Sequence, residues 1–122
     1  MTEAMPNPFD DHFRNPRNAG VLEGADVAVR VDNPVCGDIL HLYLARDSGG
    51  RVEACKFQVY GCPAAIAAGS LLTELLQGSS VDDLRSMTQE SISTALGGLG
   101  SGQVHAALLA YDAVQAAAQK WK

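Results

Sequence analysis

The chain has 122 residues, of which 47% are hydrophobic and 19% are charged, values typical of one globular domain spanning residues 1–122. Nine basic and fourteen acidic side chains give a net charge of −5, which argues against a nucleic-acid binder and an electrostatic membrane anchor. No apolar run approaches the roughly 20 residues of a bilayer span, and residues 1–11 lack a signal-peptide pattern. We therefore expect a cytoplasmic protein with no nucleic-acid and no membrane partner.

The first half of the chain predicts one short helix and three strands. The helix is expected over 6–14, with prolines near its start and acidic residues in its first turn, and the turn residues at 15–20 end it. A hairpin turn is expected at the Asp-Ser-Gly-Gly sequence 47–50. Alternating hydrophobic residues predict the strands, over 26–31, 38–45 and 52–60.

The second half of the chain predicts helices. Pro63 is favoured at a first helical position, Gly78 is a typical stop, and Ser80 is a possible cap for the next helix. The expected helices span 63–77, 81–86, 88–96 and 103–120. Strands followed by helices predict an α+β fold, in which a small three-stranded antiparallel sheet has helices packed on one side.

The three cysteines are Cys36, Cys55 and Cys62. An odd number without a signal peptide favours thiol or metal chemistry over a disulfide framework, although a free cysteine is often only a small buried hydrophobe. Cys55 is interpreted in that second way. It lies seven positions before Cys62, an odd spacing that puts the two on opposite faces of a regular strand, about 20 Å apart.

Cys36 and Asp38 form the first candidate ligand pair. They lie in a Pro-Val-Cys-Gly-Asp loop between two expected strands, and a spacing of two directs both side chains the same way in extended backbone. Thiolate and carboxylate together suit zinc or ferrous iron. The alternative for Asp38 is a turn residue that accepts hydrogen bonds from nearby backbone.

Cys62 directly precedes Pro63 and is predicted to be the N-cap of the following helix. Free backbone N–H groups and the helix dipole at this position stabilise a thiolate, which predicts a lowered pKa. Gly61 is expected to let the strand turn sharply into the helix. The alternative interpretation is a small residue in a strand-to-helix corner.

His105 stands at the start of the last expected helix, far from the C-terminal end of its dipole. We therefore expect a neutral imidazole, the form that binds metals. His12 and His41 are interpreted as packing or surface residues.

Several segments occur in a characteristic order and spacing: Asn-Pro-Arg-Asn-Ala-Gly at 15–20, Pro-Val-Cys-Gly-Asp at 34–38, Tyr-Gly-Cys-Pro-Ala-Ala-Ile-Ala at 60–67, Gly-Ser-Leu-Leu-Thr-Glu-Leu at 69–75 and Asp-Ala at 112–113. Together they resemble the IscU/NifU-type family of iron–sulfur cluster assembly scaffolds over nearly the whole chain. The resemblance implies a cluster or metal site of Cys36, Asp38, Cys62 and His105.

The chain departs from the family pattern at two places. The family's third ligand cysteine follows the histidine, and here that position is Ala106; the family's Pro-Pro-containing chaperone-binding stretch is absent from 99–104. The resemblance still implies a carrier, not an enzyme, for iron or a labile Fe–S cluster of the [2Fe–2S] type, with zinc as the alternative ion. The implied partners are a cysteine desulfurase, acceptor apo-proteins and, where two chains share a cluster through Cys36 and Cys62 of each, a homodimer.

Two other functions remain open at this stage. Ala106 favours a divergent zinc-binding or desulfurase-binding regulator that builds no cluster. A thiol at a helix N-terminus would also suit a cysteine persulfide carrier, with Cys62 or Cys36 holding the sulfur. The Gly-rich segment 97–102 is predicted to be a mobile flap over the metal site.

Overall fold

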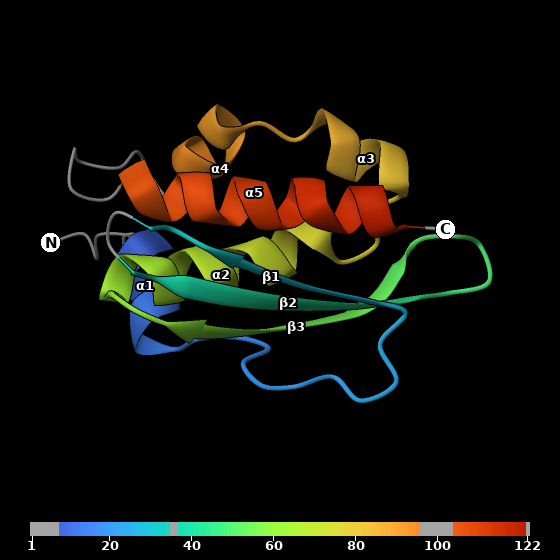
Figure 1. Ribbon diagram of the computed structural model, residues 1–122, viewed down its shortest axis with the longest axis horizontal. Coiled ribbons are helices and arrows are strands. Elements are labelled where there is room, and N and C mark those ends of the chain that lie inside the picture. The colour runs from blue at the N-terminus through green and yellow to red at the C-terminus, as the bar shows by residue number, and fades with distance from the viewer. Residues whose placement is uncertain (1–7, 35–36, 96–103, 122) are drawn as a thin grey trace, which may run out of the picture.

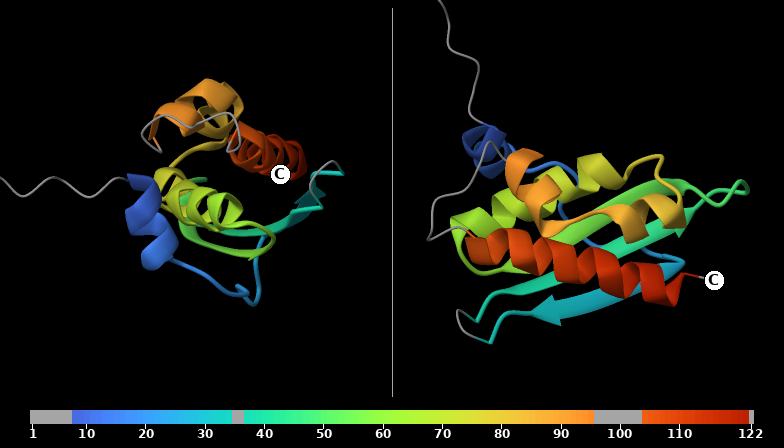
Figure 2. Two further views of the ribbon diagram at one scale, coloured as in Figure 1. Left: turned by 90° about the vertical axis from the view of Figure 1, so that its left-hand side faces the viewer. Right: turned by 90° about the horizontal axis from the view of Figure 1, so that it is seen from above.

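The computed structural model describes residues 8–34, 37–95 and 104–121. Its elements are α1 (Pro8–Arg14), β1 (Val27–Asp32), β2 (Ile39–Arg46), β3 (Val52–Tyr60), α2 (Pro63–Leu76), α3 (Val81–Ser86), α4 (Gln89–Ala95) and α5 (Val104–Lys120). Figures 1 and 2 show α2 and α5 on one face of the sheet, with α3 and α4 packed on α5 and α1 beside α2. The predicted α+β fold with helices on one side is confirmed. No helix among these described residues is long and apolar enough to cross a membrane.

The sheet has the order β1-β2-β3 with both pairs antiparallel. Leu42 of the central strand lies opposite Val29 on one side and Phe57 on the other. Because strand side chains alternate between faces, this register gathers the apolar residues on the face that the helices cover. The strand predictions are confirmed, and β1 and β2 each lie one residue later than expected.

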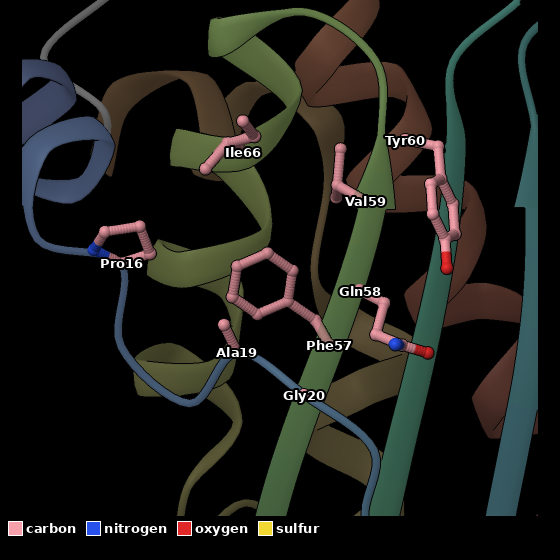
Figure 3. Close-up of a pocket in the computed structure, with 8 residues that line it drawn as sticks. All are labelled: Pro16, Ala19, Gly20, Phe57, Gln58, Val59, Tyr60 and Ile66. Atoms are coloured by element: carbon pink, nitrogen blue, oxygen red, sulfur yellow. The ribbon is translucent and has the colours of Figure 1, made fainter.

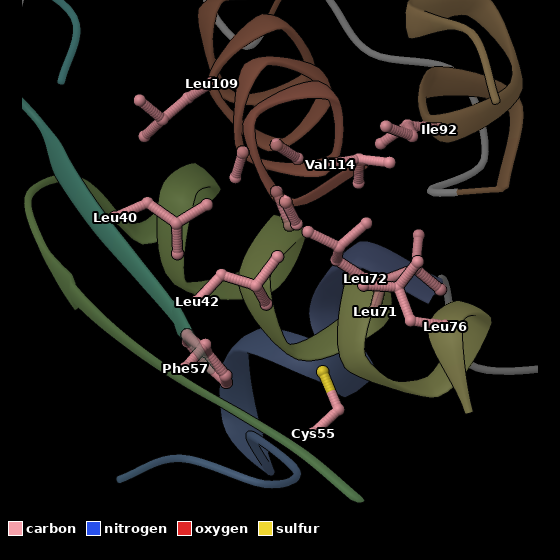
Figure 4. Packing of buried hydrophobic residues seen from close by; sticks show 14 of the residues in the cluster. Leu40, Leu42, Cys55, Phe57, Leu71, Leu72, Leu76, Ile92, Leu109 and Val114 are labelled. Carbon is pink, nitrogen blue, oxygen red and sulfur yellow. The ribbon is translucent and has the colours of Figure 1, made fainter. Parts of the chain in front are cut away.

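The core lies between that face and the helices (Figure 4). Leu42 of β2, Leu72 of α2 and Val114 of α5 are fully buried. Alanines with no exposed surface along the inner side of α5 allow the close helix packing that a core poor in aromatics requires. Cys55 is 3% exposed in this core, and burial raises the pKa of its thiol to about 12. Cys55 is therefore a packing residue, as predicted.

A buried polar network attaches α1 and the segment 15–20 to α2. The hydroxyl of Ser70 accepts the Arg17 backbone N–H at 2.8 Å and is hydrogen-bonded to His12 Nδ1 at 2.7 Å. Arg17 Nη1 lies 3.1 Å from the same Nδ1 atom. A guanidinium only donates, so Nδ1 accepts and Nε2–H points to Glu74 Oε1, 3.2 Å away. The network therefore fits a neutral His12, which is 4% exposed.

We expect this network to make folding sensitive to mild acid. Burial lowers the pKa of His12, and the adjacent Arg17 lowers it further, against the opposite effects of Glu74 and Asp11. Below the ordinary value of 6.5 the unfolded chain binds a proton that folded His12 resists, so stability falls as pH drops from 6.5 toward the lowered folded pKa. The free energy of unfolding, measured in urea between pH 7.5 and pH 5.5, should decline less steeply in His12→Asn than in the parent. Equal slopes would contradict this assignment.

The segment 15–20 also covers part of the outer edge of β3. The Phe57 N–H donates to Asn18 O at 3.0 Å, and the Gly20 N–H donates to Phe57 O at 2.8 Å. Asn18 has a φ of 63°, a left-handed conformation that asparagine tolerates better than most residues. These bonds satisfy the edge backbone at Phe57, which otherwise would be open to another strand.

Candidate functional site

Three segments lie at the same end of the sheet, on the left in Figure 1. They are the described residues that flank β1 and β2, the corner between β3 and α2, and the first turn of α5. Ile39, which opens β2, pairs with Tyr60, which closes β3. Because the strands are antiparallel, the residues just outside this pair, Asp38 and the 61–62 corner, are brought together.

Asp38 is directed at Cys62 by the local backbone. Gly37 has a φ of 75°, its N–H donates to Asn33 O at 2.7 Å, and the Asn33 N–H donates to Asp38 O at 2.9 Å. The Asp38 residue is 5% exposed. Its Oδ1 accepts the Cys62 backbone N–H at 3.3 Å, and its Oδ2 accepts the Cys62 thiol at 3.2 Å. The carboxylate thus accepts both hydrogen-bond donors of one cysteine.

Cys62 is the N-cap of α2, as predicted, with extended φ and ψ of −77° and 164°. The predicted direction of its pKa is wrong. Cys62 is an exposed residue, but partial desolvation of its sulfur raises the pKa of the thiol. The hydrogen bond and charge of Asp38 raise it too, while the backbone amides of Ala65 and Ala64 act in the opposite direction. The helix terminus favours the thiolate, but burial and a carboxylate contributed by another element outweigh it. The protonated thiol donates to Asp38.

The Asp38–Cys62 pair has the right donor chemistry for zinc or iron. On a tetrahedral zinc ion, a sulfur at ~2.3 Å and an oxygen at ~2.1 Å are separated by about 3.6 Å. The sulfur and Oδ2 are already 3.2 Å apart. The pair therefore fits two neighbouring coordination positions after a small adjustment, once the thiol proton is lost.

The other predicted ligands are placed less closely. His105 is exposed in the first turn of α5, at the same end as the pair. Cys36 and the predicted flap at 97–102 lie outside the described residues. Within the described part of the chain, no three His, Cys, Asp or Glu residues converge on one metal position. The full set of Cys36, Asp38, Cys62 and His105 thus stays a prediction, of which two members are in contact.

Neither of the remaining histidines joins this site. His41 lies on the outer face of the sheet, stacked on Tyr43 at 6.3 Å between ring centroids and edge-on to Tyr60 at 6.1 Å. His12 belongs to the network at α1. Both agree with the interpretation as packing residues.

A hollow of about 320 Å³ lies beside the end of β3 (Figure 3). Its lining is mostly apolar and comes from the segment 15–20, β3 and α2: Pro16, Ala19, Gly20, Phe57, Gln58, Val59, Tyr60 and Ile66. Among the described residues that line it there is no cysteine, histidine or carboxylate. The hollow therefore does not include the Asp38–Cys62 pair.

Gly61 has a role that the sequence interpretation missed. The predicted sharp turn does not require glycine here, because Gly61 is not among the residues of positive φ. Instead, the position of its missing side chain is filled by the Asp38 carboxylate. The motif places the two residues in separate segments, so only the fold reveals this contact.

The structure is thus a small α+β domain in which the Cys62 thiol and the buried Asp38 carboxylate are hydrogen-bonded at one end of the sheet. A family model described as "NifU-like N terminal domain" matches residues 8–122. The chain belongs to this NifU-like N-terminal domain family, which confirms the resemblance seen in the sequence.

Individual proteins agree with that assignment. The chain is 43% identical over 107 residues to "Iron-sulfur cluster assembly scaffold protein IscU 1" of Archaeoglobus fulgidus, covering 88% of this chain and 69% of the relative. It is 39% identical over 115 residues to "Iron-sulfur cluster assembly scaffold protein IscU" of Haemophilus influenzae, covering 92% and 90%.

Solved structures share the fold. The N-terminal NifU-like protein of Brucella abortus aligns with a TM-score of 0.76 at 18% identity, covering 94% of this chain and 92% of that one. A structure titled as a putative scaffold protein for the SUF system, from Fervidobacterium islandicum, aligns with a TM-score of 0.75 at 18% identity, covering 93% and 96%. At this identity the likeness concerns the fold alone.

Proposed function

We propose that this protein is an iron–sulfur cluster assembly scaffold, which holds iron or a labile cluster as cargo at the Asp38–Cys62 corner. The observation that carries the proposal is the contact between the Cys62 sulfur and the Asp38 carboxylate in a chain whose relatives are named as such scaffolds. Cysteine sulfur and carboxylate oxygen are both ligand types of zinc and iron sites, so a thiol and a carboxylate in contact fit part of such a site.

In this proposal the chain's own residues bind and release, and they catalyse no turnover. Cys36 and Cys62 supply thiolates, and Asp38 and His105 supply weaker oxygen and nitrogen ligands. Because these two ligands are weaker than thiolates, the cargo is held labile, which suits a protein that must pass it on. The Cys62 thiol proton passes to solvent when the sulfur binds the cargo, because Asp38 must stay deprotonated to act as a ligand.

The proposed partners follow from the chemistry of the cargo. Sulfide must be supplied by a cysteine desulfurase, and the finished cluster must leave to acceptor apo-proteins with free cysteines. A homodimer is a further possibility within this proposal, because Cys36 and Cys62 from two chains would give one cluster four thiolates.

Anaerobic reconstitution tests the proposal. The apo-protein is incubated with ferrous iron, cysteine, a desulfurase and dithiothreitol, which reduces the desulfurase persulfide to sulfide. Visible absorption, bound iron and bound sulfide are measured. We expect a chromophore with iron and sulfide in equal amounts. The affinity for this cargo should fall at least about tenfold in Cys36→Ala and Cys62→Ala, equivalent to about 1.4 kcal/mol, and stay unchanged in Cys55→Ala. Iron or zinc bound without sulfide would contradict the scaffold function.

A regulator that holds zinc or docks on a desulfurase is the second candidate. Ala106 favours it, since the side chain at the family's third cysteine position carries no ligand and is 3% exposed. Stoichiometric zinc and desulfurase binding without cluster formation in the same assay would support it. The persulfide carrier is less well supported, because the raised pKa of Cys62 disfavours the thiolate that accepts sulfur.

A further inference from the structure

Gly61 occupies a position where the structure leaves no room for a side chain. A Cβ atom at residue 61 would lie 2.3 Å from Asp38 Oδ1, 2.5 Å from its Cγ and 2.9 Å from its Cβ. Non-bonded carbon and oxygen atoms do not approach so closely. The backbone at Gly61 does not have the positive φ that favours glycine. Glycine is therefore required at this position by the space that Asp38 takes up.

The two shortest contacts, with Oδ1 and Cγ, would be relieved by moving the Asp38 carboxylate, and the contact with Cβ would need a slight shift of the main chain as well. Pairing of Ile39 with Tyr60 fixes the two main chains immediately beside Asp38 and Gly61. The Asn33 N–H bond to Asp38 O holds the main chain of Asp38 from the other side. A methyl group at position 61 would therefore displace the carboxylate, and both of its bonds to Cys62 would be lost.

We propose that Gly61 is a positioning residue, which leaves open the slot that keeps the Asp38 carboxylate beside the Cys62 sulfur. The inference rests on the proposed function, in which Asp38 and Cys62 are neighbouring ligands. Gly61 touches neither metal nor cluster and acts only through Asp38. Its replacement by alanine should remove the oxygen ligand while every ligand residue remains in the chain.

Metal affinity in a double-mutant cycle tests this mechanism. Cobalt(II) and zinc are titrated into apo-protein for the parent, Gly61→Ala, Asp38→Gly and the double variant. Removal of a residue that orients a ligand typically lowers metal affinity about 10–100-fold, and we expect Gly61→Ala to fall in that range. Asp38→Gly removes the three atoms nearest to the new methyl, so Gly61→Ala should then lower metal affinity roughly twofold or less.

Gly49→Ala is the matched control. Its Cβ would face Asp47 Oδ1 at 3.4 Å, an ordinary contact, in the hairpin at the opposite end of the sheet. It introduces the same methyl beside an aspartate, so metal affinity should stay at the parent's value. Thermal unfolding of each variant shows that the proteins compared are folded.

A second readout needs no metal. The Cys62 backbone N–H donates a hydrogen bond to Asp38 Oδ1. Because this bond is lost in Gly61→Ala and in Asp38→Gly, the amide hydrogen of Cys62 should exchange faster in both variants, and not in Gly49→Ala. Unchanged exchange and unchanged cobalt affinity in Gly61→Ala would overturn the inference. An equal loss of affinity in the Asp38→Gly background would also overturn it, because Gly61 would then act by another route.

Failure of the inference differs from failure of the scaffold proposal. If Gly61→Ala lowers cobalt affinity only when Asp38 is present, but the parent assembles no cluster, the Gly61 role is supported and the scaffold function is contradicted. If Gly61→Ala has normal cobalt affinity and assembles clusters normally, the scaffold function is supported and the Gly61 role is contradicted. A parent chain that binds neither cobalt nor zinc would overturn the inference as well.

Discussion

Replacement of Ser70 by alanine is expected to lower the free energy of unfolding by about 2–4 kcal/mol. Ser70 is fully buried on α2, where its hydroxyl bonds to His12 Nδ1 and the Arg17 backbone N–H. Alanine leaves the part-buried Arg17 N–H without this acceptor and removes one of two hydrogen bonds at His12 Nδ1, which keeps Arg17 Nη1; an unsatisfied polar group costs about 1–3 kcal/mol and a lost hydrogen bond about 0.5–1.5 kcal/mol. Its higher helix propensity returns only a few tenths of a kcal/mol. Urea denaturation at pH 7.5 measures the difference.

The loss should be concentrated at α1, because the Ser70 hydroxyl connects α2 to two groups that precede the sheet. Amide exchange of α1 and of the segment 15–20 should therefore accelerate more than exchange in β2. Ser79→Ala is the control, since the Ser79 hydroxyl donates to Leu75 O in an exposed hydrogen bond near the end of the same helix. That variant should stay within about 0.5 kcal/mol of the parent. The same small change in Ser70→Ala would show that the network contributes little.

The elements of this fold could be predicted because their signals are local. Period-two alternation of leucines placed β2 within one residue of its observed bounds. The α3 helix was predicted to the residue, and Ser80 caps it in a reciprocal capping box with Asp83. Such patterns need only a few neighbouring residues, and the same holds for Cys62 as the N-cap of α2.

The contacts that shape the site could not be predicted, because they join distant segments. His12 and Ser70 are 58 positions apart, and Asp38 and Cys62 are 24 apart. The wrong pKa direction of Cys62 has this origin. Its local contribution from the helix amides has the expected sign, but burial and Asp38 exceed it. The space at Gly61 depends on the same packing of separate segments.

Ala106→Cys is expected to make the assembled cluster markedly longer-lived. Residue 106 follows His105 in the first turn of α5, at the end of the molecule that carries the Asp38–Cys62 corner, and its side chain points into the protein. A thiolate there would add a third sulfur ligand to those of Cys36 and Cys62. We expect loss of the cluster to a chelator to slow by about tenfold or more, equivalent to about 1.4 kcal/mol. Visible absorption after reconstitution and chelator addition measures this rate.

Ala106→Ser separates ligand chemistry from packing. Serine adds one heavy atom at the same position in the same helix, so both variants face the crowding that a buried site imposes on added volume, about 1–3 kcal/mol. Only the cysteine can supply a thiolate. A slower loss in Ala106→Cys than in Ala106→Ser would place residue 106 at the cluster and identify the alanine as the reason for a labile site. Equal rates, with a loaded parent that sediments as a dimer, would mean instead that the missing thiolates come from a second chain.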